Sequence, residues 1–508
     1  MTWLWIILGF LALLAVFDIF QKKHAILRNF PILGHFRYIL EAIGPELRQY
    51  IVTDNDEERP FTRDQRRWVY ATSKKQNDYF GFGTDNDLEQ TPNYIFIKHS
   101  PFPLNLPVDS PHYRIPCAKV LGGHRNRPKA VRMPSAVNLS AMSFGSLSSA
   151  AVEAINQGCA LTGAWHNTGE GGISRHHLHG GELVWQIGTG YFGCRNKAGG
   201  FDLERFRSVV QQHPQVRAIE IKLSQGAKAG LGGVVLAKKV TPEIAAIRGI
   251  EAGKDCLSPP AHTAFSDADS LLDFAELLAE TSGLPVGIKS AVGQIPFWTQ
   301  LADLMKSGTR GLDFITIDGG EGGTGAAPLV FSDHVALPFK QAFSRVFLQF
   351  AEQDLHKDVV FIGSGKLGFP ESALVGFALG CDAVNVGREA MLSIGCIQAQ
   401  RCHTGHCPAG VATQNQWLMR GLDPDHKSVR LANYIKVLRK EILRVCHAAG
   451  IPHPCLMDSH QVEISDGHLG LRSLEAIYGY PAHVRPGSAE WIEQVHSLMV
   501  KITKSQAA

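Results

Sequence analysis

Residues 359–388 read VVFIGSGKLGFPESALVGFALGCDAVNVGR, and this stretch holds the repeating unit from which the fold follows. Two apolar runs, Val359–Ile362 and Ala383–Val386, flank a helical stretch at Pro370–Leu379. Short β-branched runs that alternate with helical stretches are typical of βαβ units and a parallel sheet. The stretch therefore predicts two parallel strands joined by a helix.

The same alternation extends from about Met133 to Gly395. Further strands are predicted at Ala218–Lys222, Val286–Lys289 and Phe314–Ile317, and a helix at Ala268–Glu280. A segment of this length suits one barrel of about 250 residues, so we predict an α/β fold with a (β/α)8 TIM barrel. A doubly wound sheet is the alternative, but its dinucleotide-binding half needs GxGxxG at the first βα turn. The three matches, at 188–193, 320–325 and 363–368, all lie inside the region and none opens it.

The composition bounds the class of protein. The chain has 508 residues, a formal net charge of +3 and 44% hydrophobic residues. This balance gives no basic footprint for nucleic acid and excludes wholesale disorder. We expect four regions: an N-terminal transmembrane anchor at 1–23, a connector or cap at 24–132, the barrel with its cysteine loop at 133–415, and a C-terminal helical appendage at 416–508 that includes a helix at Ala432–Ala449.

Trp3–Phe20 carries a single charge, Asp18. About 18 apolar residues form ~27 Å of helix, which just crosses a bilayer core. No basic residue precedes the run and no small-residue cleavage site follows, which favours a retained single-pass helix over a signal peptide. Cations at Lys22, Lys23 and Arg28 predict a catalytic region that faces the cytoplasm. The alternative is an amphipathic or buried N-terminal helix.

Glycine loops follow three late strands, at Asp318–Gly325, Gly363–Lys366 and Gly387-Arg388. Loops after the last barrel strands commonly bind phosphate, because glycine N–H groups reach phosphate oxygens unhindered and arginine pairs with them. Lys222 and Lys289 end apolar strands, where a cation can meet the charge of a reduced flavin or bind a carboxylate. The alternative is a lysine that snorkels from the barrel rim.

Cys396, Cys402 and Cys407 lie within twelve residues, and a proline follows the last of them. Three thiolates suit an iron–sulfur cubane that lacks one iron. Zinc is the rival, since the segment CHTGHC at 402–407 offers mixed ligands, and buried free cysteine is the third alternative. The histidine run RHHLH at 175–179 is a weaker metal possibility.

Taken together, these motifs resemble the FMN-binding synthase domain of glutamate synthases. The segments that carry the resemblance are SAMSFGS at 140–146, NTGEGG at 167–172, QIG at 186–188, IEIKLSQGAK at 219–228, GG at 232–233, SPP at 258–260, GGTGA at 322–326, and the cysteine loop through GVATQ at 410–414. The match covers roughly residues 130–415. The family's domain is a (β/α)8 barrel with FMN and a 3Fe-4S cluster, and the resemblance implies both here.

The resemblance also implies roles for individual residues. The segment against the flavin ring would be Ala141, Met142, Ser143, Phe144 and Gly145, with Lys289 near the N1 edge of the ring. The phosphate would meet Gly322, Gly323, Thr324, Gly365, Gly387 and Arg388. The positions near the flavin and the 2-oxoglutarate pocket, which with Lys289 are the predicted catalytic residues, are Glu170, Lys222, Gln225 and Lys228. The implied cluster ligands are Cys396, Cys402 and Cys407.

The implied activity is that of an oxidoreductase of the CH–NH2 class, which aminates 2-oxoglutarate with ammonia or an amine. No amidotransferase domain and no nicotinamide fingerprint in its proper context are evident, so electrons are expected from an external donor, ferredoxin-like or a reductase. One alternative is an oxidoreductase for another amine, N-alkyl amino acid or 2-oxo acid. Another is a non-catalytic, membrane-tethered redox or assembly module, against which the intact Lys289 and Glu170 argue.

Overall fold

The computed structural model describes residues 2–21, 23–55, 57–76, 79, 81–105, 113–481, 484 and 488–507, with side chains up to residue 500. Lys22, one of the cations predicted to flank the anchor, lies outside the described residues. The chain forms two compact units, Met1–Arg67 and Trp68–Ala508.

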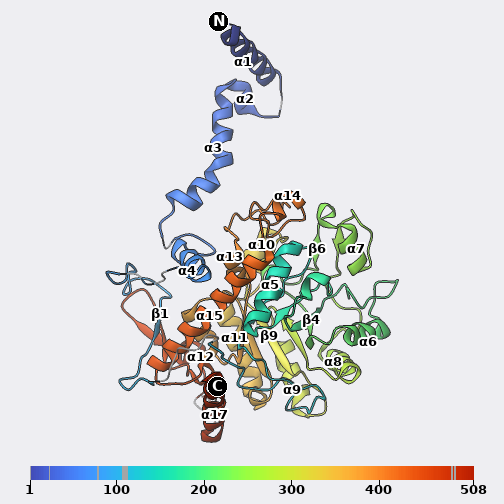
Figure 1. Ribbon diagram of the computed structural model, residues 1–508, viewed down its shortest axis with the longest axis vertical. Coiled ribbons are helices and arrows are strands. Elements are labelled where there is room, and N and C mark those ends of the chain that lie inside the picture. The colour runs from blue at the N-terminus through green and yellow to red at the C-terminus, as the bar shows by residue number, and fades with distance from the viewer. Residues whose placement is uncertain are drawn as a thin grey trace. The chain divides into compact units, whose positions relative to one another are not determined.

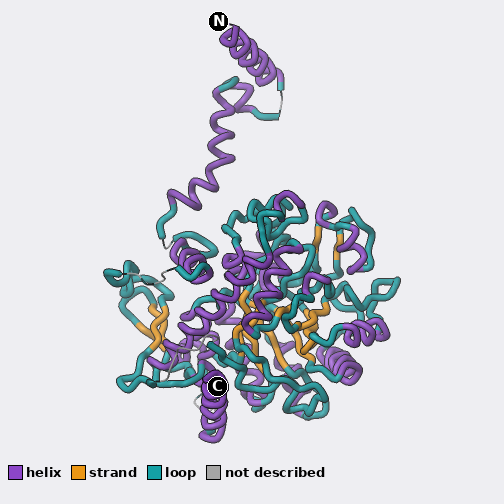
Figure 2. The backbone as a smooth tube through the Cα atoms, in the orientation of Figure 1, coloured by secondary structure: helices purple, strands orange, loops and turns teal. Residues whose placement is uncertain are grey.

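Eight parallel strands close into a barrel in the second unit (Figures 1 and 2). Their order around the barrel is β10-β11-β2-β3-β4-β5-β8-β9. Their bounds are β2 Val137–Leu139, β3 His166–Asn167, β4 Leu183–Ile187, β5 Val216–Lys222, β8 Val286–Ser290, β9 Phe314–Asp318, β10 Val360–Ser364 and β11 Ala383–Val386. The closed barrel confirms the predicted fold class and excludes the doubly wound sheet, whose strands do not close.

Helices surround the strands of the barrel (Figure 1). The larger ones are α5 Ser149–Thr162, α6 Leu203–Gln212, α8 Ala268–Ser282, α9 Pro296–Lys306, α11 Phe339–Ala351, α12 Pro370–Ala378 and α15 Pro424–Ala448. Local chemistry sets their ends: the Asp267 side chain accepts from the Ser270 N–H to begin α8, and Gly283, with φ of 72°, ends it. Shorter helices in the loops are α7 Pro242–Arg248, α10 Leu329–His334, α13 Arg388–Ile394 and α14 Gln416–Met419.

The barrel interior contains a polar layer below the carboxyl ends of the strands. One oxygen of Glu220 accepts hydrogen bonds from Asn167 Nδ2 and Gln186 Nε2, each at 2.7 Å, and the other accepts from Thr316 Oγ1 at 2.8 Å. Side chains two residues apart on a strand face the same side, so Lys222 follows Glu220 one layer nearer the strand ends. The strand period therefore directs this lysine to the end of the barrel where active sites form.

Additional strands lie outside the barrel. Strand β1, Ile95–Ile97, pairs with β12, Val462–Ser465, which pairs with β13, Leu471–Ser473, and both ladders are antiparallel. These two late strands lie among the helices predicted for 416–508, here α15, α16 Leu474–Tyr478 and α17 Ala489–Ala507. A second small ladder joins β6, Val234–Val235, to β7, Cys256–Leu257.

His453 anchors the chain between α15 and β12, and its burial predicts how stability depends on pH. Its Nε2–H donates to the Pro116 carbonyl at 2.8 Å, and its Nδ1 accepts from the Cys455 N–H at 3.1 Å. Burial lowers the pKa of His453 to about 4, whereas a histidine of the unfolded chain titrates near 6.5. The unfolded chain therefore binds the extra proton first, so this contribution to stability is complete above about pH 6.5 and is lost as the pH falls toward 4.

We expect His453→Asn to lower the melting temperature at pH 7, with a gap to the wild type that shrinks steadily down to pH 4.5. Thermal unfolding across this pH range measures the gap. A gap that stays constant or widens on acidification would contradict a neutral buried imidazole at this position.

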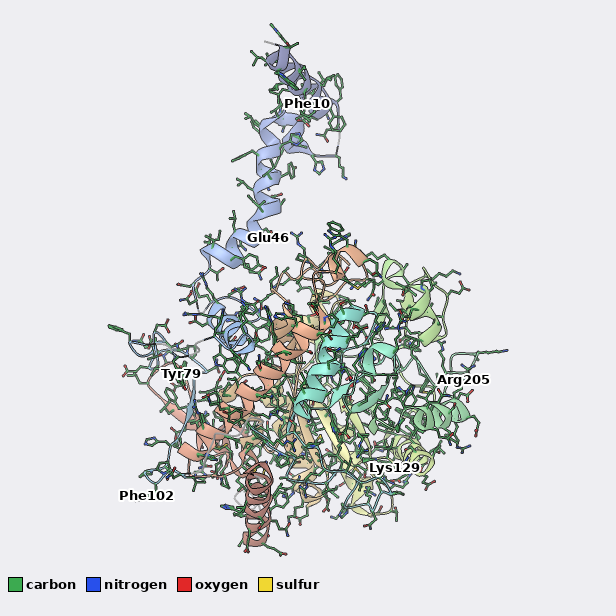
Figure 3. All side chains as sticks on the ribbon, in the orientation of Figure 1. Phe10, Glu46, Tyr79, Phe102, Lys129 and Arg205 are labelled. Carbon is green, nitrogen blue, oxygen red and sulfur yellow. The ribbon has the colours of Figure 1, made fainter. Side chains whose placement is uncertain are left out.

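The first unit contains α1 Thr2–Phe20, α2 Ala25–Asn29, α3 Leu33–Leu47 and the π-helical turn Arg48–Val52, and α4 Arg63–Ser73 crosses into the second unit. By length and composition, α1 is the one described helix that could cross a membrane. Phe10, labelled in Figure 3, is 64% exposed. Asp18 is instead fully buried, and its carboxylate accepts from the Ile32 N–H and from His35 Nε2, both at 2.9 Å.

Candidate active site

Lys222 lies at the end of β5 and forms the centre of a cluster of charged side chains. Its ammonium donates to Glu170 Oε1 at 2.7 Å and to Gln225 Oε1 at 3.2 Å. Glu170 follows β3 and Gln225 follows β5, so the loops after the two strands that flank β4 meet on this lysine. Gln225 Nε2 in turn donates to the Gly323 carbonyl at 2.9 Å, which connects the cluster to the loop after β9.

Two glycines leave the space that Glu170 occupies. A Cβ on Gly188 would lie 2.7 Å from Glu170 Oε2, and one on Gly233 would lie 2.9 Å from Oε1. Burial raises the pKa of Glu170, but the ammonium groups of Lys222 and Lys228 outweigh burial and lower it to about 2. Glu170 is therefore a carboxylate throughout the physiological pH range.

Lys228 and Lys289 are the two other predicted lysines of this region, and both are buried. Burial lowers the pKa of Lys228 to about 8, with Glu170 opposing the change, and its ammonium donates to the Gly232 carbonyl at 3.2 Å. Lys289, at the end of β8, pairs with Asp318 Oδ1 at 3.4 Å. Asp318 also accepts from the Gly226 N–H at 2.8 Å, so β8, β9 and the loop after β5 are held together.

Arg248, on α7, is a buried cation of the site that sequence reasoning missed. Its Nη2 donates to the Phe144 carbonyl at 3.2 Å, its Nη1 donates to Cys256 Sγ at 3.7 Å, and the guanidinium lies 5.1 Å from the Phe192 ring centroid. Among the described residues, its Nε has no hydrogen-bond partner. The only signal in the sequence was an arginine that ends a helical stretch between the motifs at 219–228 and 258–260.

The predicted flavin segment, Ala141–Gly145, follows β2 at the same end of the barrel. Met142 and Phe144 are buried, whereas Ala141 and Ser143 are partly exposed. The Met142 N–H donates to the Asn167 carbonyl at 3.2 Å, and Gly145 has φ of 108°, which favours glycine. The segment therefore lies between the loop that carries Glu170 and the guanidinium of Arg248.

The predicted phosphate residues follow β9, β10 and β11, which are neighbours in the barrel. A Cβ on Gly323 would lie 2.6 Å from Arg388 Cδ, and one on Gly365 would lie 2.8 Å from Phe339 Cβ, so side chains cannot replace these glycines without movement. Arg388 donates to the Glu321 carbonyl, while Thr324 Oγ1 accepts from the Ala326 N–H. The remaining positions, Gly322 and Gly387, lie in the same loops.

These loops fit the phosphate of a mononucleotide such as FMN. They combine bare glycine backbone with a guanidinium at the ends of the late strands, which is the chemistry that phosphate binding requires.

The cysteine loop runs beside the loop after β9. A Cβ on Gly325 would lie 3.7 Å from Cys402 Cβ, and the buried Lys239 donates to the Cys402 carbonyl at 2.7 Å. Burial raises the pKa of Cys396 to about 11 and also raises that of Cys402, while Arg388 and Lys239 oppose these changes. Three thiols on one loop are a suitable donor set for an iron–sulfur cluster. However, no three His, Cys, Asp or Glu side chains of the described residues are gathered closely enough to hold a metal ion.

The histidine run at 175–179 makes contacts with protein groups. His176 lies between Glu153 on α5 and Glu243 on α7. His177 Nδ1 accepts from the Ser174 N–H at 3.2 Å, and its Nε2 contacts the Met142 carbonyl at 3.4 Å. The run therefore packs the loop of Glu170 against its neighbours.

Comparison with known proteins gives a family for this chain. A model described as a conserved region in glutamate synthase matches residues 114–452. The glutamate synthase large subunit-like protein YerD of Bacillus subtilis (strain 168) is 38% identical over 468 residues, which are 85% of this chain and 88% of that protein. The glutamate synthase large subunit-like protein of Rhizobium meliloti (strain 1021) is 29% identical over 398 residues, 74% of this chain and 84% of that protein.

An archaeal glutamate synthase of Methanocaldococcus jannaschii, whose name specifies NADPH, is 34% identical over 325 residues. These residues are 63% of this chain but only 60% of the archaeal protein. The family model covers more than half of the chain, and the Bacillus relative aligns along most of both proteins. This chain therefore belongs to the glutamate synthase family.

Proposed function

We propose that this chain catalyses the reductive amination of 2-oxoglutarate to glutamate, with ammonia or an amine as the nitrogen source. With ammonium, 2-oxoglutarate takes up two electrons and two protons and releases one water. The electrons would come from an external donor, ferredoxin-like or a reductase. The chain is then an oxidoreductase of the CH–NH2 class.

The observation that carries the proposal is the set of three buried cations around one carboxylate. Lys222, Lys228 and Arg248 outnumber Glu170, and each of these four side chains lies at least partly inside the protein. Burying a surplus of positive charge is costly unless an anion compensates it. A dicarboxylate such as 2-oxoglutarate supplies two negative charges, which suits this surplus.

The pKa values of Glu170 and Lys228 suggest different roles for the two residues. With a pKa of about 2, Glu170 stays ionised and is a poor proton donor near neutral pH, so we assign it to orienting Lys222 and the amine. Lys228 has a pKa of about 8, which is near the value that favours general acid–base catalysis at physiological pH. We therefore propose Lys228 as the group that delivers a proton to the substrate.

FMN, when bound, would supply the hydride that reduces the imine of the 2-oxo acid. Ala141–Gly145 and Lys289 would hold the ring side of the cofactor, and the loops of Gly322–Thr324, Gly365 and Gly387-Arg388 would hold its phosphate. The buried Met142 and Phe144 would keep water from the reacting carbon.

A turnover assay tests the proposed reaction. Purified protein with a chemical reductant, 2-oxoglutarate and ammonium is expected to form glutamate. A panel of amines, N-alkyl amino acids and other 2-oxo acids in the same assay identifies a different substrate. Turnover with another member of the panel, but never with 2-oxoglutarate, would contradict the glutamate assignment. The flavin assignment would then still hold.

We propose that Cys396, Cys402 and Cys407 hold a 3Fe-4S cluster, on the chemistry of the donor set alone. The Cys402→Ser variant is expected to lose the visible iron–sulfur absorption and the acid-labile sulfide. It should retain flavin, since the phosphate loops lie on other strands. Iron, zinc and sulfide analysis of both proteins measures this, and stoichiometric zinc without sulfide in the wild type would contradict the cluster.

We propose that residues 1–23 attach the chain to a membrane as a single span, with the catalytic region on the cytoplasmic side. The support is the length and apolar character of α1, and the buried position of Asp18, whose charge is bound by α2–α3 groups. Deletion of residues 1–23 is expected to give a protein that is soluble without detergent and that retains its flavin. Recovery of the intact chain from gently lysed cells in the soluble fraction, without detergent, would contradict the attachment.

A further inference from the structure

A chain of hydrogen bonds holds the backbone carbonyl of Lys222. His262, which follows β7, is buried, and its Nε2 lies 2.9 Å from the Lys222 carbonyl. Its Nδ1 lies 3.1 Å from the hydroxyl of Tyr191, which follows β4 and is fully buried. Neither residue belongs to the motifs that suggested the family.

The partners fix the position of every proton in this chain. A carbonyl oxygen only accepts, so His262 Nε2 must carry its hydrogen and donate it to Lys222. The neutral imidazole then accepts at Nδ1 from the Tyr191 hydroxyl. That hydroxyl oxygen itself accepts from the N–H groups of Thr263 and Ala264, both at 3.0 Å. The Tyr191 hydroxyl thus donates once and accepts twice, and each ring nitrogen of His262 has one partner.

The Tyr191 backbone is held in a conformation that few residues adopt. Its φ is 48°, in the left-handed region where residues other than glycine are uncommon. The hydroxyl bonds to the segment around His262 stabilise this conformation. The ring of the next residue, Phe192, lies 5.1 Å from the Arg248 guanidinium. The same turn therefore contacts Arg248 directly and Lys222 through His262.

We propose that Tyr191 and His262 are positioning residues that hold Lys222 in place for the anionic substrate, an inference that rests on the proposed function. Lys222 is the last residue of β5, in register with Lys289 of β8. His262 donates to its carbonyl, and the ammonium of Lys222 thereby stays beside Glu170 and Gln225. The affinity for the 2-oxo acid thus depends on two side chains that do not touch it.

Protonation of His262 would break the chain, because Nδ1–H would then face a hydroxyl oxygen whose lone pairs are already occupied. The groups that face His262 are the Tyr191 hydroxyl, the Lys222 carbonyl and ammonium, and the carboxylate of Glu170. Burial lowers the pKa of His262, which agrees with a neutral ring.

Four variants of the full-length holoprotein test the proposal. Tyr191→Phe removes the hydroxyl, His262→Leu removes both ring hydrogen bonds, and His262→Gln keeps an N–H donor for the Lys222 carbonyl. Tyr480→Phe is the matched control, because it removes another buried hydroxyl that donates to a backbone carbonyl, that of Leu379, at 2.6 Å.

Two measurements are compared across the variants. Amide hydrogen exchange of residues 222–226 reports order at Lys222 without any substrate. Titration with 2-oxoglutarate, followed by flavin absorbance, gives the dissociation constant, and steady-state turnover gives KM and kcat. We expect exchange and the dissociation constant to rise ~10-fold in Tyr191→Phe and His262→Leu, the size of one lost hydrogen bond, with KM changing more than kcat. His262→Gln should recover most of the wild-type values.

Unchanged exchange and affinity in both Tyr191→Phe and His262→Leu would overturn the proposal, as would equal changes in Tyr480→Phe. Should His262→Leu fail to fold, Tyr191→Phe and His262→Gln decide the question. Should the wild type give no response to 2-oxoglutarate, the proposed reaction fails, and the exchange comparison alone decides whether the two residues position Lys222.

Discussion

Replacement of Lys222 by methionine is expected to raise the dissociation constant for 2-oxoglutarate by at least ~100-fold, the scale of a charge-assisted hydrogen bond that is lost in a buried site. The methionine has a similar length but no charge. The variant removes the partner that lies 2.7 Å from Glu170 Oε1, so the pocket loses one positive charge and the partly buried Glu170 keeps only the more distant cations Lys228 and Arg248. The pKa of Glu170 should therefore rise from its value of about 2.

Titration with 2-oxoglutarate, followed by flavin absorbance, measures this effect. The control is Lys238→Met, which changes an exposed lysine elsewhere on the same barrel. A change of less than about threefold in Lys222→Met, or an equal change in Lys238→Met, would remove Lys222 from the anion site.

Gly226→Ala should cause a large loss of stability for the addition of a single methyl group. A Cβ at Gly226 would overlap the backbone carbonyl of Gly319, and backbone cannot rotate away as a side chain can. The Gly226 N–H donates to Asp318, which pairs with Lys289, so the strain would spread to both. We expect the free energy of unfolding to fall by about 3 kcal/mol, the upper range for overpacked sites, and flavin occupancy to fall with it.

Gly293→Ala provides the matched control, because nothing lies within 4 Å of a Cβ at Gly293. Denaturant unfolding and the flavin content of both variants decide the comparison. Equal stability and equal flavin occupancy in Gly226→Ala and Gly293→Ala would contradict the close approach of the loops after β5 and β9.

The barrel was predictable because each of its later strands contains a short run rich in β-branched and other apolar residues. The runs at 218–222, 286–289, 314–317 and 383–386 all lie within β5, β8, β9 and β11. The predicted strand at 359–362 is displaced to Val360–Ser364, since Gly363 and Ser364 continue the ladders with β9 and β11. A glycine and a serine read as a turn in sequence, and only the neighbouring strands make them part of the sheet.

Strands β2, β3 and β4 were not predicted, and the sequence of β3 explains why that strand was missed. β3 consists of His166 and Asn167 alone, and both are buried polar residues. Asn167 is needed inside the barrel because it donates to Glu220. Hydrophobic periodicity cannot find a strand whose inward side chains form a hydrogen-bonded layer.

The site was predictable where a motif carried it and not where packing alone did. Glu170, Lys222, Gln225 and Lys228 stand in segments that resemble a family, and the structure brings them together at one end of the barrel. Arg248 and Tyr191 come from a short helix and a turn outside those segments. Their positions depend on long-range contacts, with Phe144 and His262 respectively, which a linear pattern does not contain.

A single-turnover experiment tests the proposed reaction most directly. The protein is reduced anaerobically by a chemical reductant in the absence of substrate, and is then mixed with 2-oxoglutarate and ammonium while flavin absorbance and glutamate are recorded. The account predicts that the flavin reoxidises only when both substrates are present and that one glutamate forms for each two electrons withdrawn. Flavin that remains reduced with both substrates present, and no glutamate formed, would contradict it.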